Sequence, residues 1–343
     1  MTPRRARSAV LGALTLAALT TITACGSGSA GSAGGAAGSA TTQTGVSIAQ
    51  ATRLVNTYSV ANNLVNSTYS AARDQAIEEP PASVASIAGL QASRVQGKLI
   101  PQTQYFGSTF AVPRITGYPR LVLAVTHLRS EGTTVPYTIY LLFVQDAAGA
   151  PWRVAYYPFS TGQVPVPAVL AAANDSAPAV TTSTGLVVDP ASINAALYAH
   201  ATGQPNASAS PLPLAPTPEL DQQLTDGYTG GVQEYNASGV NVYQTLLPTA
   251  YPIYLIRTKG GGALAFSADE VRDMLVPIHP GGVVHLPAGS SEAELAGQPN
   301  GATAARYSVV RIQMFMSYIP PQSNPGSGVE LLSYSDYPIS VSS

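Results

Sequence analysis

The sequence predicts an α+β fold made of two consecutive units, each with helices followed by an antiparallel sheet. Residues 48–95 carry apolar side chains at three- and four-residue spacing, which indicates helices. Residues 110–157 are instead rich in Val, Ile, Leu, Tyr and Phe, which indicates strands. The same order recurs between residues 189 and 334. Segregated helices and antiparallel strands define the α+β class, and the analogy extends to an NTF2-like cone for one or both units.

The first helix is predicted over residues 48–76, where apolar residues form one long face. Ser47 is suited to cap its start, and Pro80-Pro81 stops it. Asn62-Asn63 lowers the helix propensity midway, so a kink or break in this helix is expected at these two residues.

A second helix is predicted over residues 84–95, capped by Ser83 and ended by Gly97. Residues 146–149 then form the loop of an antiparallel hairpin, with Gly149 free to adopt a positive φ. Both faces of residues 137–145 are apolar, which predicts a central strand. The strands expected in this unit are residues 110–115, 121–128, 137–145 and 152–157.

The second unit begins at Asp189-Pro190, an N-cap followed by proline at the first helical position, and this helix ends at Gly203. Another short helix opens at Thr217-Pro218-Glu219, and Gly227 and Gly230-Gly231 are expected to end it. The strands expected after it are residues 240–246, 252–257, 263–266, 306–318 and 329–334.

The start of the chain carries an export and anchoring signal. A basic segment with Arg4, Arg5 and Arg7 precedes an uncharged run over residues 9–18 that is too short to span a membrane. Ile22-Thr23-Ala24-Cys25 then resembles the lipobox of bacterial lipoproteins. This resemblance implies cleavage before Cys25 and lipidation of its thiol, which would hold the protein on the outer side of the cell membrane.

Two alternatives to this interpretation are an ordinary secretory signal with an unrelated cysteine, and export through a twin-arginine signal at Arg4-Arg5. Cys25 is the only cysteine of the 343 residues, so an intrachain disulfide is excluded. The predicted organisation is a signal peptide over residues 1–24, a tether rich in Gly, Ser and Ala over 25–45, a first domain over 46–165, a connector over 166–188 and a second domain over 189–343.

The charge of the chain argues against nucleic acid as a partner. Removal of residues 1–24 takes away three arginines and no acid, so the formal net charge changes from −2 to −5. The remaining chain has no basic stripe.

A second resemblance lies in the C-terminal half. Residues 251–257, followed by residues 260–266, are similar to a segment of actinobacterial secreted lipoproteins of unknown function. The Tyr- and Asn-containing stretch over residues 58–63 adds to this likeness. The resemblance implies a location in the cell envelope and supplies no catalytic residues.

His279 and His285 form the sharpest candidate for chemistry, with Asp269, Glu270 and Asp273 just upstream. Two imidazoles and a carboxylate can hold a metal or transfer protons. A spacing of six residues across Pro-Gly-Gly matches no regular ligand pattern, so a surface loop is the favoured interpretation.

Three further patterns have plainer explanations. The glycines after Lys259 lack the Lys-Ser/Thr and the helix of a phosphate loop, which favours a hairpin turn. No Gly-x-Ser-x-Gly elbow is present; Ser47 fits a helix cap and Ser291 a loop. His127 and His200 have no obvious partner in the sequence.

Tyrosine is the last signal. Ten of the 18 tyrosines fall on or beside predicted strands. There they can cover partly solvent-exposed sheet faces or, in a concave sheet, line a ligand pocket. They are Tyr137, Tyr140, Tyr156, Tyr157, Tyr251, Tyr254, Tyr307, Tyr318, Tyr334 and Tyr337.

Together these patterns predict a non-catalytic envelope lipoprotein without a cofactor. It would be anchored through Cys25 and would bind a small ligand or another envelope protein. The rival hypotheses are an envelope hydrolase or metal-dependent enzyme using His279 and His285, and a structural partner in an envelope assembly.

Overall fold

The computed structural model describes residues 46–113, 117–160, 179–180, 184–203, 212–324, 326 and 328–343. The predicted signal peptide, Cys25 and the tether lie outside these residues, as does most of the connector. The fold belongs to the α+β class, as the sequence predicts. None of the helices in the described ranges is both long and apolar enough to cross a membrane.

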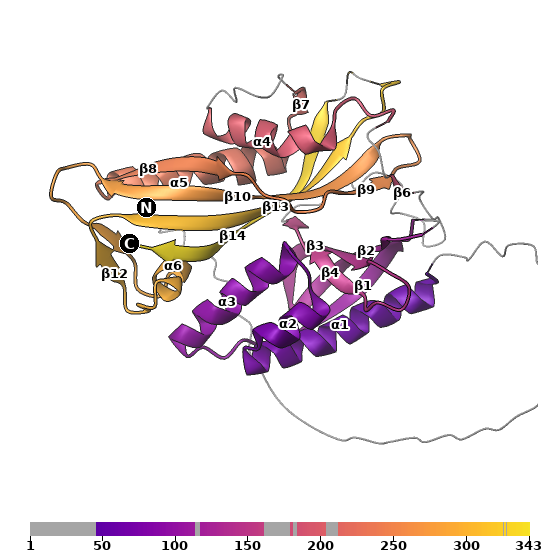
Figure 1. Ribbon diagram of the computed structural model, residues 1–343, viewed down its shortest axis with the longest axis horizontal. Helices are drawn as coiled ribbons and strands as arrows, with labels where there is room; N and C mark the ends of the chain where they lie inside the picture. Colours follow the sequence, from indigo (N-terminus) through magenta and orange to yellow (C-terminus); the bar gives the residue numbers. More distant parts are fainter. Residues whose placement is uncertain are drawn as a thin grey trace, which may run out of the picture.

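The first half consists of three helices and a five-stranded antiparallel sheet in the order β1-β2-β3-β4, with β5 also paired to β3 (Figure 1). Strand β3 is central, as its two apolar faces indicate. The elements are α1 (Ile48–Thr68), α2 (Ala71–Ile77), α3 (Ala82–Gln96), β1 (Thr103–Ala111), β2 (Arg120–Ser130), β3 (Thr133–Gln145), β4 (Arg153–Tyr156) and β5 (Phe159–Ser160).

The second half is built on a seven-stranded sheet in the order β6-β9-β10-β13-β14-β7, with β8 also paired to β10 and a separate β11-β12 pair. Among the described residues of this sheet, the short β14–β7 pairing is the only parallel one. The strands are β6 (Ala179–Val180), β7 (Leu214–Ala215), β8 (Val240–Leu247), β9 (Tyr254–Arg257), β10 (Ala263–Pro277), β11 (Val284–Leu286), β12 (Ala302–Ala304), β13 (Tyr307–Ile319) and β14 (Val329–Ser342). The helices are the 3-10 turn η2 (Pro190–Ser192), α4 (Ile193–Thr202), the π-helix η3 (Glu219–Thr225), α5 (Asp226–Ala237) and α6 (Ser291–Leu295).

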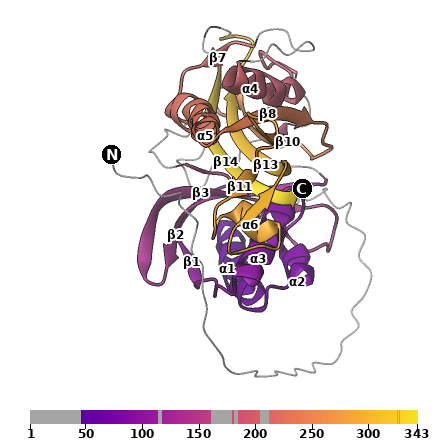
Figure 2. The same ribbon diagram turned by 90° about the vertical axis from the view of Figure 1, so that its left-hand side faces the viewer.

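The two sheets pack against each other and share one core, so the molecule has a layer of helices, two sheets and a second layer of helices. Leu142 of β3 and Phe266 of β10 lie in the core between the sheets. The residues adjacent to these two in their strands point to the opposite face of each sheet, toward the helices. Phe143 packs against α1, and Ala265 packs against α4 and η3. Figure 2 shows the two helical layers on opposite sides of the strands. Each sheet is therefore covered on both faces, which explains its apolar runs.

The helix break predicted at Asn62-Asn63 is wrong; α1 continues to Thr68 and ends at Tyr69, which adopts a left-handed conformation. Asn63 is used for a tertiary contact instead, because its side chain bonds both the carbonyl oxygen (2.9 Å) and the N–H (2.8 Å) of Thr103 in β1. Ser47 caps α1 through a capping box, as predicted.

The cap expected at Ser83 is also wrong, because α3 begins at Ala82, two residues before the predicted start, and Ser83 lies buried inside it. Gly97 ends α3 in a left-handed conformation, as predicted.

The glycines at 227, 230 and 231 do not end a helix. η3 and α5 run through them, with Leu220 and Leu224 buried at one end and Tyr235 packed at the other. This tertiary packing outweighs a propensity loss of about 1 kcal/mol per glycine.

Strand β10 is much longer than residues 263–266, because its polar second half also pairs with β13 and β8. The glycines after Lys259 form the predicted turn between β9 and β10, with the Thr258 N–H donating to Gly262 O over 2.8 Å. The division into two domains and the NTF2-like analogy remain predictions.

Candidate ligand-binding cleft

The rival constellation of two histidines and a carboxylate is not assembled among the described residues. His279 lies exposed in the loop after β10, and the exposed His285 in β11 has its ring Nδ1 2.8 Å from the hydroxyl of Thr303. Asp269 accepts a hydrogen bond from Thr249 (3.2 Å), and Asp273 accepts one from Gln244 (2.8 Å). Within the described ranges, no group of three or more His, Cys, Asp or Glu side chains is placed to hold a metal ion.

The other polar candidates have local structural roles. Ser291 is the first residue of α6, which Ser290 caps by accepting a hydrogen bond from the Ala293 N–H, so the loop assignment of Ser291 is wrong. His127 is exposed on β2 beside the ring of Phe106, and His200 is exposed near the end of α4.

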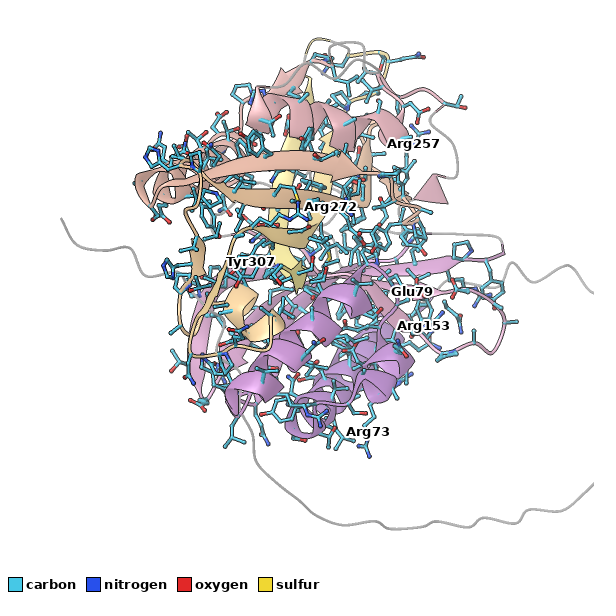
Figure 3. The ribbon with its side chains drawn as sticks, turned by 60° about the vertical axis from the view of Figure 1, so that its left-hand side comes forward. Arg73, Glu79, Arg153, Arg257, Arg272 and Tyr307 are labelled. Atoms are coloured by element: carbon cyan, nitrogen blue, oxygen red, sulfur yellow. The ribbon has the colours of Figure 1, made fainter. Side chains whose placement is uncertain are left out.

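A cleft of about 580 Å³ opens where the first half of the chain meets the second. The first half contributes the α2–α3 junction and the β3–β4 hairpin, and the second half contributes the β8–β9 loop and β10. Figure 3 shows Glu79 and Arg153 near each other at this boundary. The lining residues are Glu79, Pro80, Asp146, Arg153, Pro248, Thr249, Ala250, Tyr251, Pro252, Tyr254 and Glu270.

Arg153 organises the first-half wall. Its Nη2 atom lies 3.0 Å from Glu79 Oε2 and 2.7 Å from Asp146 Oδ2. The Glu79 backbone N–H donates to the carbonyl oxygen of Val154 (3.0 Å), which fixes the α2–α3 junction against β4. Burial and the nearby Asp146 raise the pKa of Glu79, while Arg153 opposes this shift.

Two tyrosines organise the opposite wall. The Tyr254 hydroxyl donates to Glu79 Oε1 (3.2 Å), and the Tyr251 hydroxyl donates to Glu270 Oε1 (2.6 Å). Burial, with a further contribution from these carboxylates, raises the pKa of both tyrosines well above the usual range. Both hydroxyls therefore remain protonated donors at physiological pH.

A third tyrosine joins the two halves beneath the cleft. Tyr156 is fully buried between the sheets, and its hydroxyl donates to the carbonyl oxygen of Pro252 (2.5 Å). Its ring meets that of Tyr254 edge to face, with centroids 6.0 Å apart. This contact anchors the β8–β9 loop to the first half.

A separate acid pair, Asp74 and Glu78, lies in the interior behind the α2–α3 junction. Asp74 is fully buried, and neither carboxylate oxygen has a hydrogen-bond partner among the described residues. Glu78 accepts a hydrogen bond from the hydroxyl of Tyr58 (2.5 Å). Burial raises the pKa of both carboxyls, and for Asp74 the charge of Glu78 adds to the shift. Each group therefore retains its proton at a higher pH than a surface carboxyl does.

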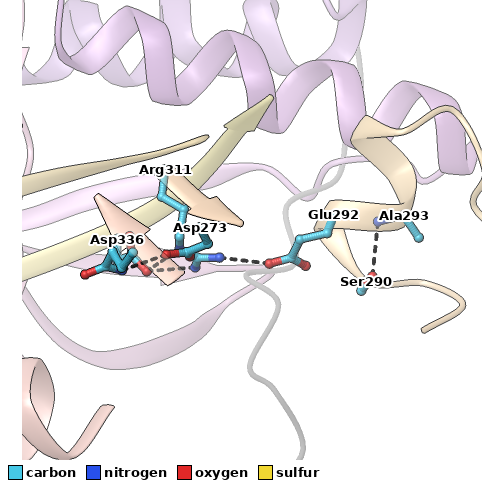
Figure 4. A network of polar contacts seen from close by, with 7 residues as sticks. Asp273, Ser290, Glu292, Ala293, Arg311 and Asp336 are labelled. Atoms are coloured by element: carbon cyan, nitrogen blue, oxygen red, sulfur yellow. Dashed lines mark hydrogen bonds and ion pairs between the residues drawn. The ribbon is translucent and has the colours of Figure 1, made fainter. Parts of the chain in front are cut away.

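Another group of charges, each partly buried, tightens the second half (Figure 4). Arg311 in β13 contacts Asp336 in β14 through Nε (2.8 Å) and Glu292 in α6 through Nη1 (2.9 Å). The adjacent carboxylates, including Asp273, raise the pKa of Arg311 well above its usual range, although burial opposes them. This arrangement holds α6 against the sheet.

Some of the residues that line the cleft could be singled out from the sequence. The segment from Tyr251 stands out as a motif, and Tyr251 and Tyr254 do line a pocket, whereas Tyr140 and Tyr156 fill the core between the sheets. Glu79, Asp146 and Arg153 are not predicted. The signals for them are an acidic pair before two prolines, and opposite charges flanking a hairpin loop.

These features define a four-layer α+β protein with a polar, tyrosine-lined cleft between its two halves. Over residues 42–342 the sequence matches the model of a family described as a domain of unknown function, DUF8094, and the chain belongs to this family. Neither a curated protein nor a solved structure matches the chain.

Proposed function

We propose that this protein is a lipoprotein of the cell envelope, anchored through Cys25 on the extracytoplasmic side, whose folded body binds a small ligand without catalysis. The cleft between the two halves is the observation that carries the binding role. Its volume of about 580 Å³ lies within the range of small-molecule sites. Converging tyrosine hydroxyls and carboxylates supply the few polar groups that orient a ligand.

The lipobox-like Ile22-Thr23-Ala24-Cys25 supports the anchor, and the Gly-, Ser- and Ala-rich residues after it support a flexible tether. Two acyl chains suffice for stable attachment to a bilayer, at about 0.8 kcal/mol per buried methylene.

The proposed membrane anchor is tested with a Cys25→Ser variant produced in the native cell type. Membrane fractionation and labelling with an alkyne fatty acid are the measurements. The wild type is expected in the membrane fraction with the label, and the variant is expected to lose both. An unlabelled wild type, or a variant retained equally in the membrane, contradicts the anchor.

The binding role is tested on the full chain in neutral detergent by NMR titration with small-molecule probes. Shifts confined to the residues of the cleft are expected. Shifts elsewhere, or turnover of an envelope substrate by the purified protein, contradict this proposal.

A further inference from the structure

We infer that the ligand of the cleft carries a protonated amine or a guanidinium group. This inference rests on the proposed binding role and adds the chemical class of the ligand. It follows from the inventory of hydrogen-bond donors and acceptors along the cleft, together with its charge and its aromatic rings.

Acceptors dominate the lining. Three carboxylates, Glu79, Asp146 and Glu270, face one guanidinium, Arg153, so with all four groups ionised the lining carries a formal charge of −2. The single contact found for the Glu270 carboxylate in the described part of the chain is the hydrogen bond that Oε1 accepts from Tyr251. A carboxylate can accept about four hydrogen bonds, so Glu270 retains capacity for a ligand.

Donors are largely committed to the protein itself. The hydroxyls of Tyr251 and Tyr254 donate to the carboxylates, and that of Thr249 points to Asp269 Oδ1 (3.2 Å). Nη2 of Arg153 contacts two acids, and its Nε, which has no hydrogen-bond partner among the described residues, is buried and out of reach of solvent. Three other lining residues are prolines and have no backbone N–H: Pro80, Pro248 and Pro252.

The excess of hydrogen-bond acceptors and negative charge in the cleft favours some ligand classes over others. An anion meets net negative charge and few free donors, and an uncharged polyol finds few donors for its oxygens. A primary ammonium or a guanidinium supplies the missing donors together with the opposite charge. The rings of Tyr251 and Tyr254 can make cation–π contacts with such a group, each contributing about 0.5–1 kcal/mol at a partly exposed site. The cleft is therefore complementary to a small cation.

Three probes of one shape test the inference: benzylammonium, benzyl alcohol and benzoate, with charges of +1, 0 and −1. Each is titrated by NMR into the full chain in neutral detergent at low and high salt. Benzylammonium is expected to bind at least tenfold more tightly than benzyl alcohol, and more weakly as salt rises. Benzoate is expected not to bind.

Glu270→Gln removes one charge while its amide oxygen can still accept from Tyr251. This variant should lose most of the preference for benzylammonium. The matched control is Glu234→Gln, an identical charge change on the exposed face of α5, which should retain the preference. Thermal unfolding of both variants verifies that they are folded.

Such a cation can belong to a free small amine or to a basic side chain of a partner protein. Binding of the lysine tripeptide acetyl-Gly-Lys-Gly-amide distinguishes these two sources. Tighter binding of the tripeptide than of benzylammonium assigns the site to a basic side chain of a partner, and weaker binding assigns it to a free amine. Equal binding of benzyl alcohol and benzylammonium overturns the cation inference but leaves the cleft as a ligand site. If none of the three benzyl probes binds in the cleft, the proposed binding role fails as well.

Discussion

Glu78 and Glu79 are adjacent in the sequence but lie in different environments. Glu78 points into the interior beside Asp74 and accepts a hydrogen bond from Tyr58, whereas Glu79 lines the cleft between Arg153 and Tyr254. Both carboxyls are buried and both accept from a tyrosine, yet only Glu79 has a cation partner and access to the cleft. The comparison teaches that one chemical motif serves two purposes. In the interior it makes stability depend on pH, and in the cleft it presents acceptors to a ligand.

The largest expected difference between the two environments is in stability. Glu78→Ala leaves a cavity and an unpaired Tyr58 hydroxyl, so the free energy of unfolding should fall by about 3 kcal/mol. Glu79→Ala should lower it by only about 1 kcal/mol, because Arg153 keeps Asp146 as a partner. Urea unfolding at pH 6 measures both. Equal losses would contradict the distinction.

The second expected effect is on the pH dependence of stability. Because the folded state binds the protons of Asp74 and Glu78 more tightly than the unfolded state does, the free energy of unfolding should fall as the pH rises from about 4 through neutrality. Each carboxyl contributes a slope of at most about 1.4 kcal/mol per pH unit.

Asp74→Asn removes one of these protons and should flatten the slope, stabilising the protein near neutral pH by about 2 kcal/mol. Unfolding curves at several pH values provide the measurement. A slope that Asp74→Asn does not alter excludes the interior pair as its source.

The third effect concerns Arg153, the positively charged side chain of the cleft. Arg153→Met removes the positive charge nearest to Glu79 and Asp146, so benzylammonium should bind about threefold more tightly, since each opposite-charge contact at a partly exposed site contributes a fraction of a kcal/mol. The free energy of unfolding should fall by about 1 kcal/mol. Titration calorimetry and urea unfolding measure the two changes. Weaker binding of benzylammonium would mean that Arg153 itself contacts the ligand.

The smallest expected effect is the difference between two matched tyrosine substitutions. Tyr58→Phe removes one of the donors to the Glu78 carboxylate in the interior, where Ser86 remains, and should cost about 1 kcal/mol. Tyr251→Phe leaves Glu270 beside the cleft, where water can replace the lost hydroxyl, and should cost about 0.5 kcal/mol. Thermal unfolding of the two variants in parallel measures the difference, and a larger loss for Tyr251→Phe would reverse the assignment of interior and cleft.

The helices and strands that end at strong local signals are predictable from the sequence. Ser47 and Gly97 mark helix ends because a side-chain cap and a left-handed glycine act within one turn. The second half of β10 escapes prediction because Asp269, Glu270 and Asp273 interrupt its apolar pattern, although pairing with β13 and β8 keeps the strand extended.

The cleft is only partly predictable for a related reason. Tyr251 and Tyr254 attract notice as aromatic residues in one short segment. Glu79 and Tyr254 are 175 residues apart, and only the packing of the two sheets brings them together. No local pattern specifies which face of the α2–α3 junction holds Glu78 and which holds Glu79.

The most direct test of the account is NMR of the full chain with ¹³C-labelled tyrosine rings during a benzylammonium titration. The signals of Tyr251 and Tyr254 are expected to shift in a saturable manner, while those of Tyr58 and Tyr140 in the interior stay in place. Unmoved signals from both cleft tyrosines, or shifts of the interior tyrosines alone, would contradict the assignment of the cleft as a site for cations.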